Sequence, residues 1–420
     1  MSSHELDGRR VLVVGLARSG TAAAHALVAA GARVRAYDRD ERVDVGRLAE
    51  LGVELHLGPE EKRLLQGIDL VVKSPGVPGE TPLVAGAREL GIPVWSEIEL
   101  GVRLLPNPLL GVTGTNGKTT TSELLGTVFR AAGRPVEVAG NVGRPLTSLA
   151  GAVSPDAWIV CELSSFQLED VHTLRPRVGV LLNLEPDHLD RHGTFEAYAE
   201  AKLRLFALQE PGDVAVVRRG LGPVPGRGRR LEFGAGDELP AEPRIPGLHN
   251  RENAAAATVA ARAAGIGDAA IAEALQTFPG VPHRIETVRE LRGVRYVNDS
   301  KATNVAAALR ALASFPDARL HVILGGRGKK EPYEPLAAAF KADDRAYLIG
   351  ESAGEIASAL RARDVSYVEA GSLEDALAEA SSAAAPRDVV LLSPACASFD
   401  QFDDFEARGD AFRRLVEALS

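Results

Sequence analysis

GVTGTNGKTT (Gly111–Thr120) decides the fold of the central part of this chain. It stands between an apolar run and a helix-type stretch, as a strand, a glycine turn and a helix would. In such a turn, backbone N–H groups and the helix N-terminus bind phosphate oxygens. The usual loop, G-x-x-x-x-G-K-[ST], would have its first glycine where Val112 stands. The stretch predicts a variant phosphate loop turned by Gly114 and Gly117, which argues against a typical GTPase or motor ATPase.

The side chains of this loop predict how a nucleotide is held. Lys118 would neutralise the β- and γ-phosphates, and the Thr119 hydroxyl would ligate Mg²⁺. A chance glycine turn before a helix is the alternative, and the place of GKTT between a strand and a helix disfavours it. The predicted ATP contacts of the loop are Gly114, Thr115, Asn116, Gly117, Lys118, Thr119 and Thr120.

Strand and helix patterns alternate in three blocks, which predicts an α/β protein. In the first block VLVVG, SGTAAAHALVAAG, RVRAYD and DLVVKSPG follow one another in βαβ order, so its sheet is expected to be parallel. Polar residues end the buried-strand patterns of the second block, where ligands of open α/β sheets bind. Boundaries near residue 97 and at FPGVPHR (Phe278–Arg284) predict three domains. These domains comprise residues 1–97, 98–281 and 282–420.

Composition excludes several classes of protein. The chain has 420 residues, a net charge of -9 and a pI near 5.6, so no nucleic-acid partner is expected. Cys161 and Cys396 are far apart and match no metal spacing, which fits a reducing cytosol. No apolar run reaches the roughly 20 residues of a spanning helix, and from the polar start we expect no signal peptide. We expect a soluble, cytoplasmic protein with no membrane partner.

GLARSG (Gly15–Gly20) stands where a dinucleotide-binding fingerprint would stand. The middle glycine of that fingerprint is Ala17, whose side chain would crowd the approach of a pyrophosphate. Asp38 ends the second strand, where it could bind a hydroxyl. The residues leave open a plain βα turn without ligand and a nucleotide-sugar site, and they disfavour an NAD site.

Three further residues lie near strand ends or on a following helix. Glu162 and His188 each follow a predicted strand and could hold a second Mg²⁺ near Thr119, although histidine is a less usual ligand than oxygen for this ion. Lys202 lies on the next helix. Its spacing alone predicts a solvated lysine with an apolar stem.

Polar groups are dense at the end of the second block and in the third block. Asn250 and Asn253 lie one helical turn apart, which suits a base or a ribose. Arg284 follows a domain boundary, where hinge closure could bring it onto phosphates. Three loops, in VNDSKATN, GGRGKKEPY and SPACASFDQF, follow strands of one predicted sheet and together indicate an anion pocket.

These motifs carry a family resemblance along essentially the whole chain. GTNGKTT, GNVG, ELSSFQLE, NLEPDHLDRH, AKLRLF, GLHNRENAAAA, PHRIE, NDSKATN and SPACASFDQF follow one another as in the Mur ligases of peptidoglycan synthesis. The combination of ELSSFQLE, NDSKATN and SPACAS is most similar to the D-glutamate-adding member. Two departures are Arg18 in the uracil-side turn and a shortened region around Gly220–Glu242.

The resemblance implies an N-terminal Rossmann-like domain for the UDP-linked substrate, a central P-loop ATPase domain and a C-terminal Rossmann-like domain for D-glutamate. It also implies a role for each matching residue. Lys118, His188 and Lys202 would be catalytic, and Asn253, Arg284 and Asp299 would complete the ATP site. The UDP-linked substrate would contact Ala17, Arg18, Ser19, Asp38, Arg39, Ser74, Gly76, Asn141 and His188. D-glutamate would contact Lys301, Thr303, Lys329, Ser398 and Phe405. The metal-site residues would be Thr119, Glu162, His188 and Lys202, with Lys202 carbamylated.

The implied activity is the ATP-dependent joining of D-glutamate to UDP-MurNAc-L-Ala through an acyl phosphate, with two Mg²⁺ ions, in a monomer. One alternative is a related ligase, such as another Mur enzyme or a folylpolyglutamate synthase, against which Ser398 and Phe405 argue. The other is a nucleotide-dependent switch or an NAD-linked oxidoreductase without ligase activity. Ala17 and Val112 weigh against that second alternative.

Overall fold

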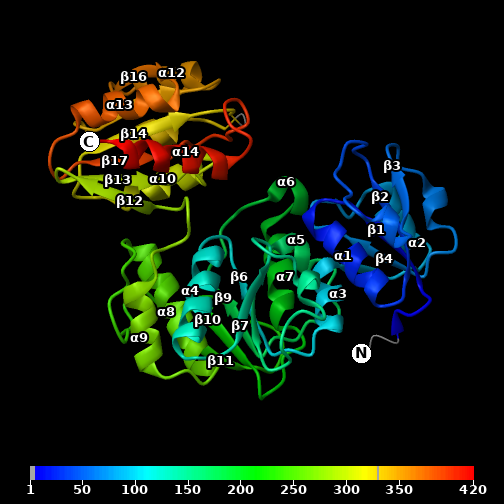
Figure 1. Cartoon of the computed structure of the whole chain (residues 1–420). Helices are drawn as coiled ribbons and strands as arrows, with labels where there is room; N and C mark the ends of the chain where they lie inside the picture. Colours follow the sequence, from blue (N-terminus) through cyan, green and yellow to red (C-terminus); the bar gives the residue numbers. More distant parts are fainter. Residues whose placement is uncertain (1–4, 329–330) are drawn as a thin grey trace. The chain divides into compact units, whose positions relative to one another are not determined.

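The computed structural model describes residues 5–328 and 331–420, which form two compact units. The first unit comprises Met1–Arg244 and His249–Phe278, and the second comprises Ile245–Leu248 and Pro279–Ser420. The described residues build three sheets, two in the first unit and one in the second, each covered by helices (Figure 1). The predicted fold class, an α/β protein with an N-terminal Rossmann-like, a central P-loop and a C-terminal Rossmann-like domain, is confirmed.

The first sheet has the strand order β3-β2-β1-β4-β5, and its strands pair in parallel as predicted. Alternate residues of β1 serve the two faces, because Val11 and Val13 pack towards α1 whereas Leu12 and Val14 pack towards α2. The order reverses between β1 and β4, so the loops after these strands lie side by side at a topological switch point. Its elements are β1 (Arg10–Val14), α1 (Arg18–Ala29), β2 (Arg33–Asp38), β3 (Glu54–Leu57), β4 (Leu70–Lys73), α2 (Pro82–Glu89) and β5 (Val94–Ser96).

The second sheet has the order β11-β10-β9-β6-β8-β7 and is also parallel. Its central strands β8, β6 and β9 are buried on both faces, which explains their unbroken apolar runs. Its elements are α3 (Glu97–Leu104), β6 (Leu109–Thr113), α4 (Lys118–Ala131), β7 (Val136–Gly140), β8 (Trp158–Glu162), α5 (Ser165–Leu168), β9 (Val178–Leu181), α6 (Leu189–His192), α7 (Phe195–Leu203), β10 (Val214–Arg218), β11 (Arg229–Phe233), α8 (Leu248–Ala263) and α9 (Asp268–Thr277). The Gly- and Pro-rich segment after Arg218 connects β10 to β11.

The third sheet has the order β12-β13-β17-β14-β15-β16. Helices α10, α11 and α12 cover one face, and α13 and α14 cover the other. The ends of the neighbouring strands β13, β17 and β14 bring together the three polar loops that the sequence singles out. Its elements are β12 (Glu286–Leu291), β13 (Val294–Asn298), α10 (Val305–Ala313), β14 (Leu320–Gly325), α11 (Glu334–Ala338), β15 (Arg345–Ile349), α12 (Ala353–Arg361), β16 (Ser366–Gly371), α13 (Leu373–Ala383), β17 (Val389–Leu392) and α14 (Phe405–Ala418).

Two strands of the third sheet, β12 and β16, have no counterpart in the sequence prediction. β12 pairs antiparallel with β13 through the two-residue turn Arg292–Gly293, in which φ is 53° and 78°. Positive φ at both positions is typical of a type I′ hairpin turn. β12 is an edge strand of alternating exposure with little apolar character, so its pattern is weak.

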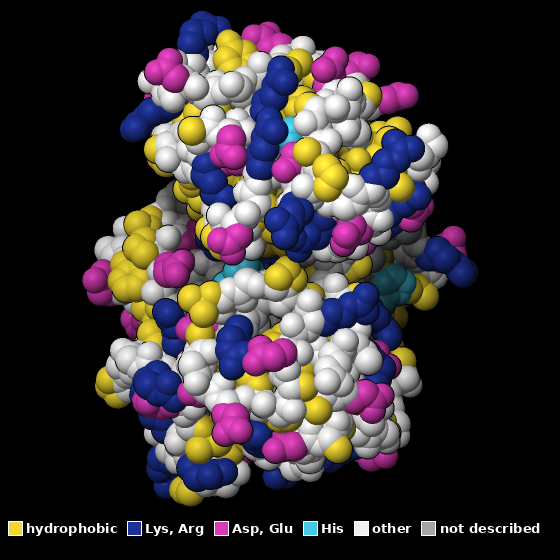
Figure 2. Space-filling model, turned by 90° about the vertical axis from the view of Figure 1, so that its left-hand side faces the viewer, with side chains coloured by type: hydrophobic (Ala, Val, Ile, Leu, Met, Phe, Trp, Pro, Cys, Tyr) yellow, Lys and Arg dark blue, Asp and Glu magenta, His cyan; other side chains and the backbone are white. Residues whose placement is uncertain are grey.

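The surface of the described chain shows no marked separation of charge in the view of Figure 2. There, Lys and Arg side chains are interspersed with Asp and Glu side chains and with uncharged groups. No helix in residues 5–328 or 331–420 is both long enough and apolar enough to cross a membrane.

Candidate active site

The glycine-rich loop between β6 and α4 turns as the sequence predicts. Gly114 has a φ of 150° and Gly117 a φ of 84°, a region that side chains other than glycine rarely adopt. A Cβ atom at Gly117 would lie 2.2 Å from Asn253 Oδ1, so α8 places Asn253 directly against the loop. Val112 lies inside β6 and is fully buried. The position that holds the first glycine of the usual motif therefore lies within a strand in this chain.

A residue that the sequence analysis does not identify holds this loop in place. Asn183, just beyond β9, accepts the Thr115 N–H at its backbone oxygen (3.1 Å) and the Asn116 N–H at Oδ1 (2.8 Å). The Tyr198 hydroxyl of α7 donates to Thr115 Oγ1 over 2.9 Å. The one sequence signal for Asn183 is its place directly after a buried strand.

The side chains that begin α4 are drawn into the same region. The Lys118 amine donates to the carbonyls of Gly114 and Thr115, each over 2.9 Å. Thr119 and Thr120 are buried in the first turn of the helix. The predicted phosphate-binding residues thus lie together at the carboxyl end of β6.

Glu162 ends β8, directly beside the phosphate loop. It pairs in register with Val112 of β6 and is buried, with 3% exposure. Its Oε1 atom accepts a hydrogen bond from Asn141 Nδ2 over 3.0 Å, and its carbonyl accepts the Asn141 N–H over 2.9 Å. A residue predicted for metal binding and a residue predicted for substrate binding therefore contact each other.

His188 precedes the single turn of α6 and has a left-handed backbone, with φ 52° and ψ 33°. This conformation is uncommon for a residue other than glycine and marks a constrained position. Its imidazole is about half exposed, and its ring centre lies 4.8 Å from that of Phe166 in α5. The ring is thus available to a ligand while one side rests on an aromatic side chain.

Lys202 is buried, with 2% exposure. The prediction from spacing alone, a solvated surface lysine, is therefore wrong. α7 turns its side chain inward, where the amine donates to the Gly114 carbonyl over 2.9 Å and lies 4.7 Å from the Tyr198 ring centre. Burial, reinforced by the charge of Lys118, lowers the pKa of the Lys202 amine to about 6. The amine is therefore largely neutral at pH 7.

The protein groups near the loop fit a magnesium ion that binds together with phosphates. The Thr119 hydroxyl and the Glu162 carboxylate offer oxygen atoms, which this ion prefers, and Mg²⁺ commonly takes its other ligands from phosphates and water. Across the described ranges, no group of three or more His, Cys, Asp and Glu side chains could hold a metal by itself. The metal would thus be recruited with the nucleotide.

The expected UDP-side residues gather where β1 and β4 end. Asp38 accepts the Leu16 N–H at Oδ2 over 2.6 Å, and the Ser74 hydroxyl donates to the Gly15 carbonyl over 2.9 Å. A Cβ atom at Gly20 would lie 1.7 Å from Gly15 O, so only glycine permits this approach of α1 to the strand. Asp38 therefore shapes the turn with one carboxylate oxygen.

Ala17, Arg18 and Ser19 open α1 at the same edge, and Arg39 is exposed beside Asp38. The Arg18 guanidinium donates to the Gly143 carbonyl over 3.2 Å and so reaches the GNVG segment of the second sheet. Ala17 and Arg18 line a surface depression of about 1040 Å³. Gly76, after β4, has open space where a Cβ would stand.

In the second unit, Asp299 follows β13 and is buried. Its carboxylate accepts the Ser393 hydroxyl over 2.8 Å and the Ile285 N–H over 3.2 Å. Burial raises the pKa of Asp299 to about 7, while the Ser393 hydrogen bond and the Arg284 charge act against the rise. Both neighbours of Arg284 have positive φ, 61° at His283 and 45° at Ile285. A strained backbone of this kind is typical of functional positions.

The predicted D-glutamate residues are joined by two side chains that the sequence analysis does not assign. The Ser300 hydroxyl donates to the Phe405 carbonyl over 2.8 Å. The buried Arg408 guanidinium donates to the carbonyls of Ser300 (2.9 Å) and Cys396 (3.2 Å). The Lys301 amine lies 5.3 Å from the Phe405 ring centre. The loop after β13, the loop after β17 and the start of α14 are thereby held as one group.

Thr303 and Ser398 belong to two of these loops, and Ser398 is buried with 2% exposure. Lys329 lies outside the described residues. The structure therefore brings together the predicted residues of β13 and β17, each within the second unit.

The three helix-covered sheets and the phosphate loop define a nucleotide-binding α/β protein. Comparison with known proteins identifies its family. The N-terminal domain of MurD-like Mur ligases matches residues 9–96. The Mur ligase middle domain matches residues 112–220, and the Mur ligase glutamate ligase domain matches residues 283–396.

Relatives cover nearly the full chain. The UDP-N-acetylmuramoylalanine–D-glutamate ligase of Anaeromyxobacter dehalogenans is 46% identical and covers 99% of both chains. The enzyme of the same name from Myxococcus xanthus is 43% identical, again over 99% of both. The chain therefore belongs to the Mur ligase family. It is an ATP-dependent ligase of peptidoglycan-precursor synthesis, as the sequence predicts.

Solved structures share the fold at lower identity. A Mur ligase (MurF) from Thermotoga maritima in complex with ADP aligns with a TM-score of 0.63 at 18% identity, covering 98% of each chain. UDP-N-acetylmuramate-alanine ligase from the same organism aligns with a TM-score of 0.57 at 20% identity, covering 97% of this chain and 98% of that one. Similarity at this level concerns the fold alone.

Proposed function

We propose that the chain joins D-glutamate to the L-alanyl carboxylate of UDP-N-acetylmuramoyl-L-alanine at the expense of ATP. One observation supports the assignment most strongly. Lys118 and Lys202, from two different helices, both donate to the carbonyl of Gly114. The predicted catalytic lysines therefore meet at the phosphate loop. The names of the full-length relatives support the choice of substrates.

The first step would activate the carboxylate, because a carboxylate is a poor electrophile and forms no amide directly. An oxygen atom of the L-alanyl carboxylate attacks the γ-phosphorus of ATP, the bond to the β-phosphate oxygen breaks, and ADP leaves. Lys118 would neutralise charge on the transferring phosphoryl group, and Asn253 lies where a nucleotide on the loop would pass. Positioning and electrostatic stabilisation account for most catalysis of this kind.

In the second step, the amine nitrogen of D-glutamate attacks the acyl-phosphate carbon to give a tetrahedral intermediate. Phosphate then leaves with the C–O electron pair, and the nitrogen loses a proton to form the amide. His188, constrained and half exposed beside Phe166, would contact the substrate near the reacting carboxyl group. Asn141 and the buried Glu162 would hold the adjoining part of the site.

Lys202 would react with CO₂ when neutral. Its amine nitrogen forms a bond to carbon and loses a proton, which turns a cation into a carbamate anion. The burial that lowers the pKa of Lys202 supports this assignment, because only the neutral amine is nucleophilic. Mg²⁺, for which two sites are proposed, would supply positive charge to the phosphate oxygens. Thr119, Glu162 and the carbamate of Lys202 would hold it, and His188 would lie nearby.

The second unit would bind D-glutamate through Lys301, Thr303, Ser398 and Phe405. Their loops meet at the ends of β13 and β17, and the Ser300–Arg408 hydrogen bonds support one shared pocket. Arg284 and Asp299 remain predicted ATP contacts, and Lys329 a predicted D-glutamate contact. With ATP and a UDP-linked precursor as substrates, the reaction would proceed in the cytoplasm, and we propose a monomer.

A coupled assay of ADP release tests this function. The purified chain receives ATP, Mg²⁺ and UDP-MurNAc-L-Ala, and then D-glutamate, L-glutamate or another amino acid of a panel. We expect ADP release with D-glutamate, and release at least about 100-fold slower with L-glutamate. Absence of ADP release with D-glutamate, or preference for another amino acid, would refute the assignment.

A further inference from the structure

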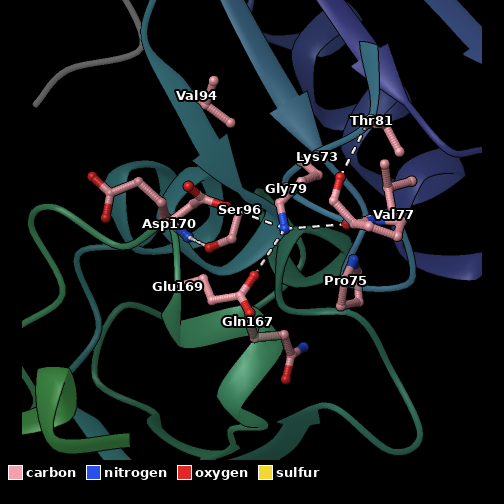
Figure 3. Close-up of polar contacts among 12 residues, drawn as sticks. Lys73, Pro75, Val77, Gly79, Thr81, Val94, Ser96, Gln167, Glu169 and Asp170 are labelled. Atoms are coloured by element: carbon pink, nitrogen blue, oxygen red, sulfur yellow. Dashed lines mark hydrogen bonds and ion pairs between the residues drawn. The ribbon is translucent and has the colours of Figure 1, made fainter. Parts of the chain in front are cut away.

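A buried group of charges joins the first sheet to the second, close to the loop that follows β4. This loop, Pro75–Gly79, contains Gly76, which the family resemblance assigns to the UDP-linked substrate. Lys73, the last residue of β4, has an amine with 0% exposure. Its Nζ atom lies 3.3 Å from Glu169 Oε2 and 3.2 Å from Asp170 Oδ2 (Figure 3). Both carboxylates follow α5, a helix that packs beside the second sheet.

Hydrogen bonds from Lys73 of the first sheet and from Arg191, a residue near the second sheet, hold the Pro75–Gly79 loop. The Lys73 amine donates to the Val77 carbonyl over 3.3 Å. Arg191, from α6, donates to the same Val77 carbonyl over 3.0 Å and to the Pro75 carbonyl over 3.2 Å. The two carbonyls that flank Gly76 are therefore both fixed by Arg191, a residue of the second layer.

Arg191 is itself held by a carboxylate and by an aromatic ring. Its Nη2 atom lies 3.4 Å from Glu169 Oε2, the carboxylate oxygen that Lys73 also contacts. Its guanidinium carbon lies 4.3 Å from the centre of the Phe166 ring, the ring on which His188 rests. Its side chain is 12% exposed. A planar cation with bidentate hydrogen bonds, a carboxylate partner and a stacked ring has little freedom to move.

The place of Arg191 in the chain gives this arrangement a consequence. Arg191 lies in the same helical turn as His188, the residue proposed to contact the substrate near its reacting carboxyl group. A shift of the loop around Gly76 relative to His188 would break the hydrogen bonds of Arg191 to Pro75 and Val77. Arg191 therefore links the Gly76 loop directly to the helical turn that contains His188.

We propose that Arg191 is a positioning residue for the UDP-linked substrate, which it serves by fixing the Gly76 loop relative to His188. It touches neither ATP nor D-glutamate in this scheme. The inference rests on the proposed function for the identity of the substrate. Lys73, Glu169 and Asp170 support Arg191 from behind by neutralising one another inside the interface.

The test compares Arg191→Gln and Arg191→Lys with a control, Arg175→Gln. Arg175 also pairs with carboxylates of the same unit, Asp213 at 2.7 Å and Glu210 at 3.0 Å, and within the described residues it forms no hydrogen bond or ion pair with the Gly76 loop. Binding of UDP-MurNAc-L-Ala is measured by calorimetry without ATP, and KM values for ATP and for this substrate are measured in the coupled assay.

For Arg191→Gln we expect weaker binding of UDP-MurNAc-L-Ala and a higher KM for it, both by about 10- to 100-fold, with the KM for ATP changed by less than about threefold. Arg191→Lys should recover part of the loss, and Arg175→Gln should resemble the wild type. Equal changes in both KM values, unchanged binding, or a loss shared by Arg175→Gln would overturn the inference. If Arg191→Gln does not fold, Arg191→Lys decides by the same ratio of KM values.

The two proposals fail differently in this experiment. If the wild-type chain does not bind UDP-MurNAc-L-Ala, the proposed function is wrong. If the wild type binds it and the Arg191 variants bind it equally well, the function stands and the positioning role of Arg191 is refuted.

Discussion

Two lysines of the first unit are almost completely buried, and their surroundings differ in kind. Lys73 has 0% exposure and lies between the carboxylates of Glu169 and Asp170. Lys202 has 2% exposure, and its amine donates to a neutral carbonyl, that of Gly114. Within the described residues Lys202 forms no ion pair, and its pKa falls to about 6.

This difference separates a structural charge from a reactive one. A buried amine between carboxylates organises its neighbours through ion pairs, at the risk of strong destabilisation if one partner is removed. A buried amine without a carboxylate partner loses its proton and becomes a nucleophile. We therefore assign Lys73 to the support of the Gly76 loop and Lys202 to chemistry at the phosphate loop.

The largest effect is expected from Lys202→Ala. Loss of the proposed carbamate should lower kcat by about 1000-fold, a magnitude typical of losing one preorganised electrostatic group. Formate or acetate added to the assay should restore part of the activity by replacing the carboxylate. An active Lys202→Ala enzyme would contradict the assignment, and so would one that short carboxylates never rescue.

A second prediction concerns stability at the other lysine. Lys73→Met should lower the free energy of unfolding by about 3 kcal/mol, because the buried Asp170 and the partly buried Glu169 both lose the cationic partner that lies between them. The measurement is the urea midpoint of the first unfolding transition. The triple variant Lys73→Met, Glu169→Gln, Asp170→Asn should recover most of the loss.

The exposed pair of Arg47 and Glu50 provides the matched control. Arg47→Met should change stability by no more than about 0.5 kcal/mol, since exposed ion pairs contribute little. Equal losses in Arg47→Met and Lys73→Met would show that burial of the charge group is not what matters.

The smallest effect is a gain in stability. The pKa of Lys202 lies at about 6 in the folded chain against an ordinary value of 10.5, so the unfolded chain binds the extra proton between these values. Stability should thus fall as pH falls from 10.5 towards 6 and then level off. Lys202→Met should raise the unfolding midpoint at pH 7 by roughly 3 °C in CO₂-free buffer, because the Gly114 carbonyl should keep Lys118 as a hydrogen-bond donor.

Thermal unfolding of both proteins at several pH values checks this prediction. The advantage of Lys202→Met should shrink as pH approaches 10.5. An advantage independent of pH would mean that lost packing strain, rather than proton binding, explains the gain.

Much of this fold could be predicted from the sequence, because the decisive patterns are local. The apolar strand before Gly114, the helix that begins at Lys118 and the βαβ order of the first block depend on neighbouring residues. The hairpin of β12 and β13 could not be predicted from the sequence. An edge strand as charged as ETVREL has a weak pattern, and the turn requires a positive φ at Arg292.

The site was predictable only in part, for a related reason. Motif residues such as Lys118 and Glu162 can be recognised because they stand at or after the end of a predicted strand. Lys202 looks like a surface lysine by spacing, and only the family resemblance indicates a role for it. Lys73 and Glu169 stand 96 residues apart, and nothing local connects them. Their pairing, like that of Arg191 with the Gly76 loop, forms only when the first sheet and its helices pack against those of the second sheet.

The most direct test of the contrast between the two lysines is carbon-13 NMR of the full chain in labelled bicarbonate. The account predicts one carbamate resonance at pH 7 to 8 that weakens as pH falls below about 6, where the Lys202 amine is protonated. The resonance should disappear in Lys202→Ala and persist in Lys73→Met. A wild-type chain without this resonance, or a resonance that Lys202→Ala retains, would contradict the account.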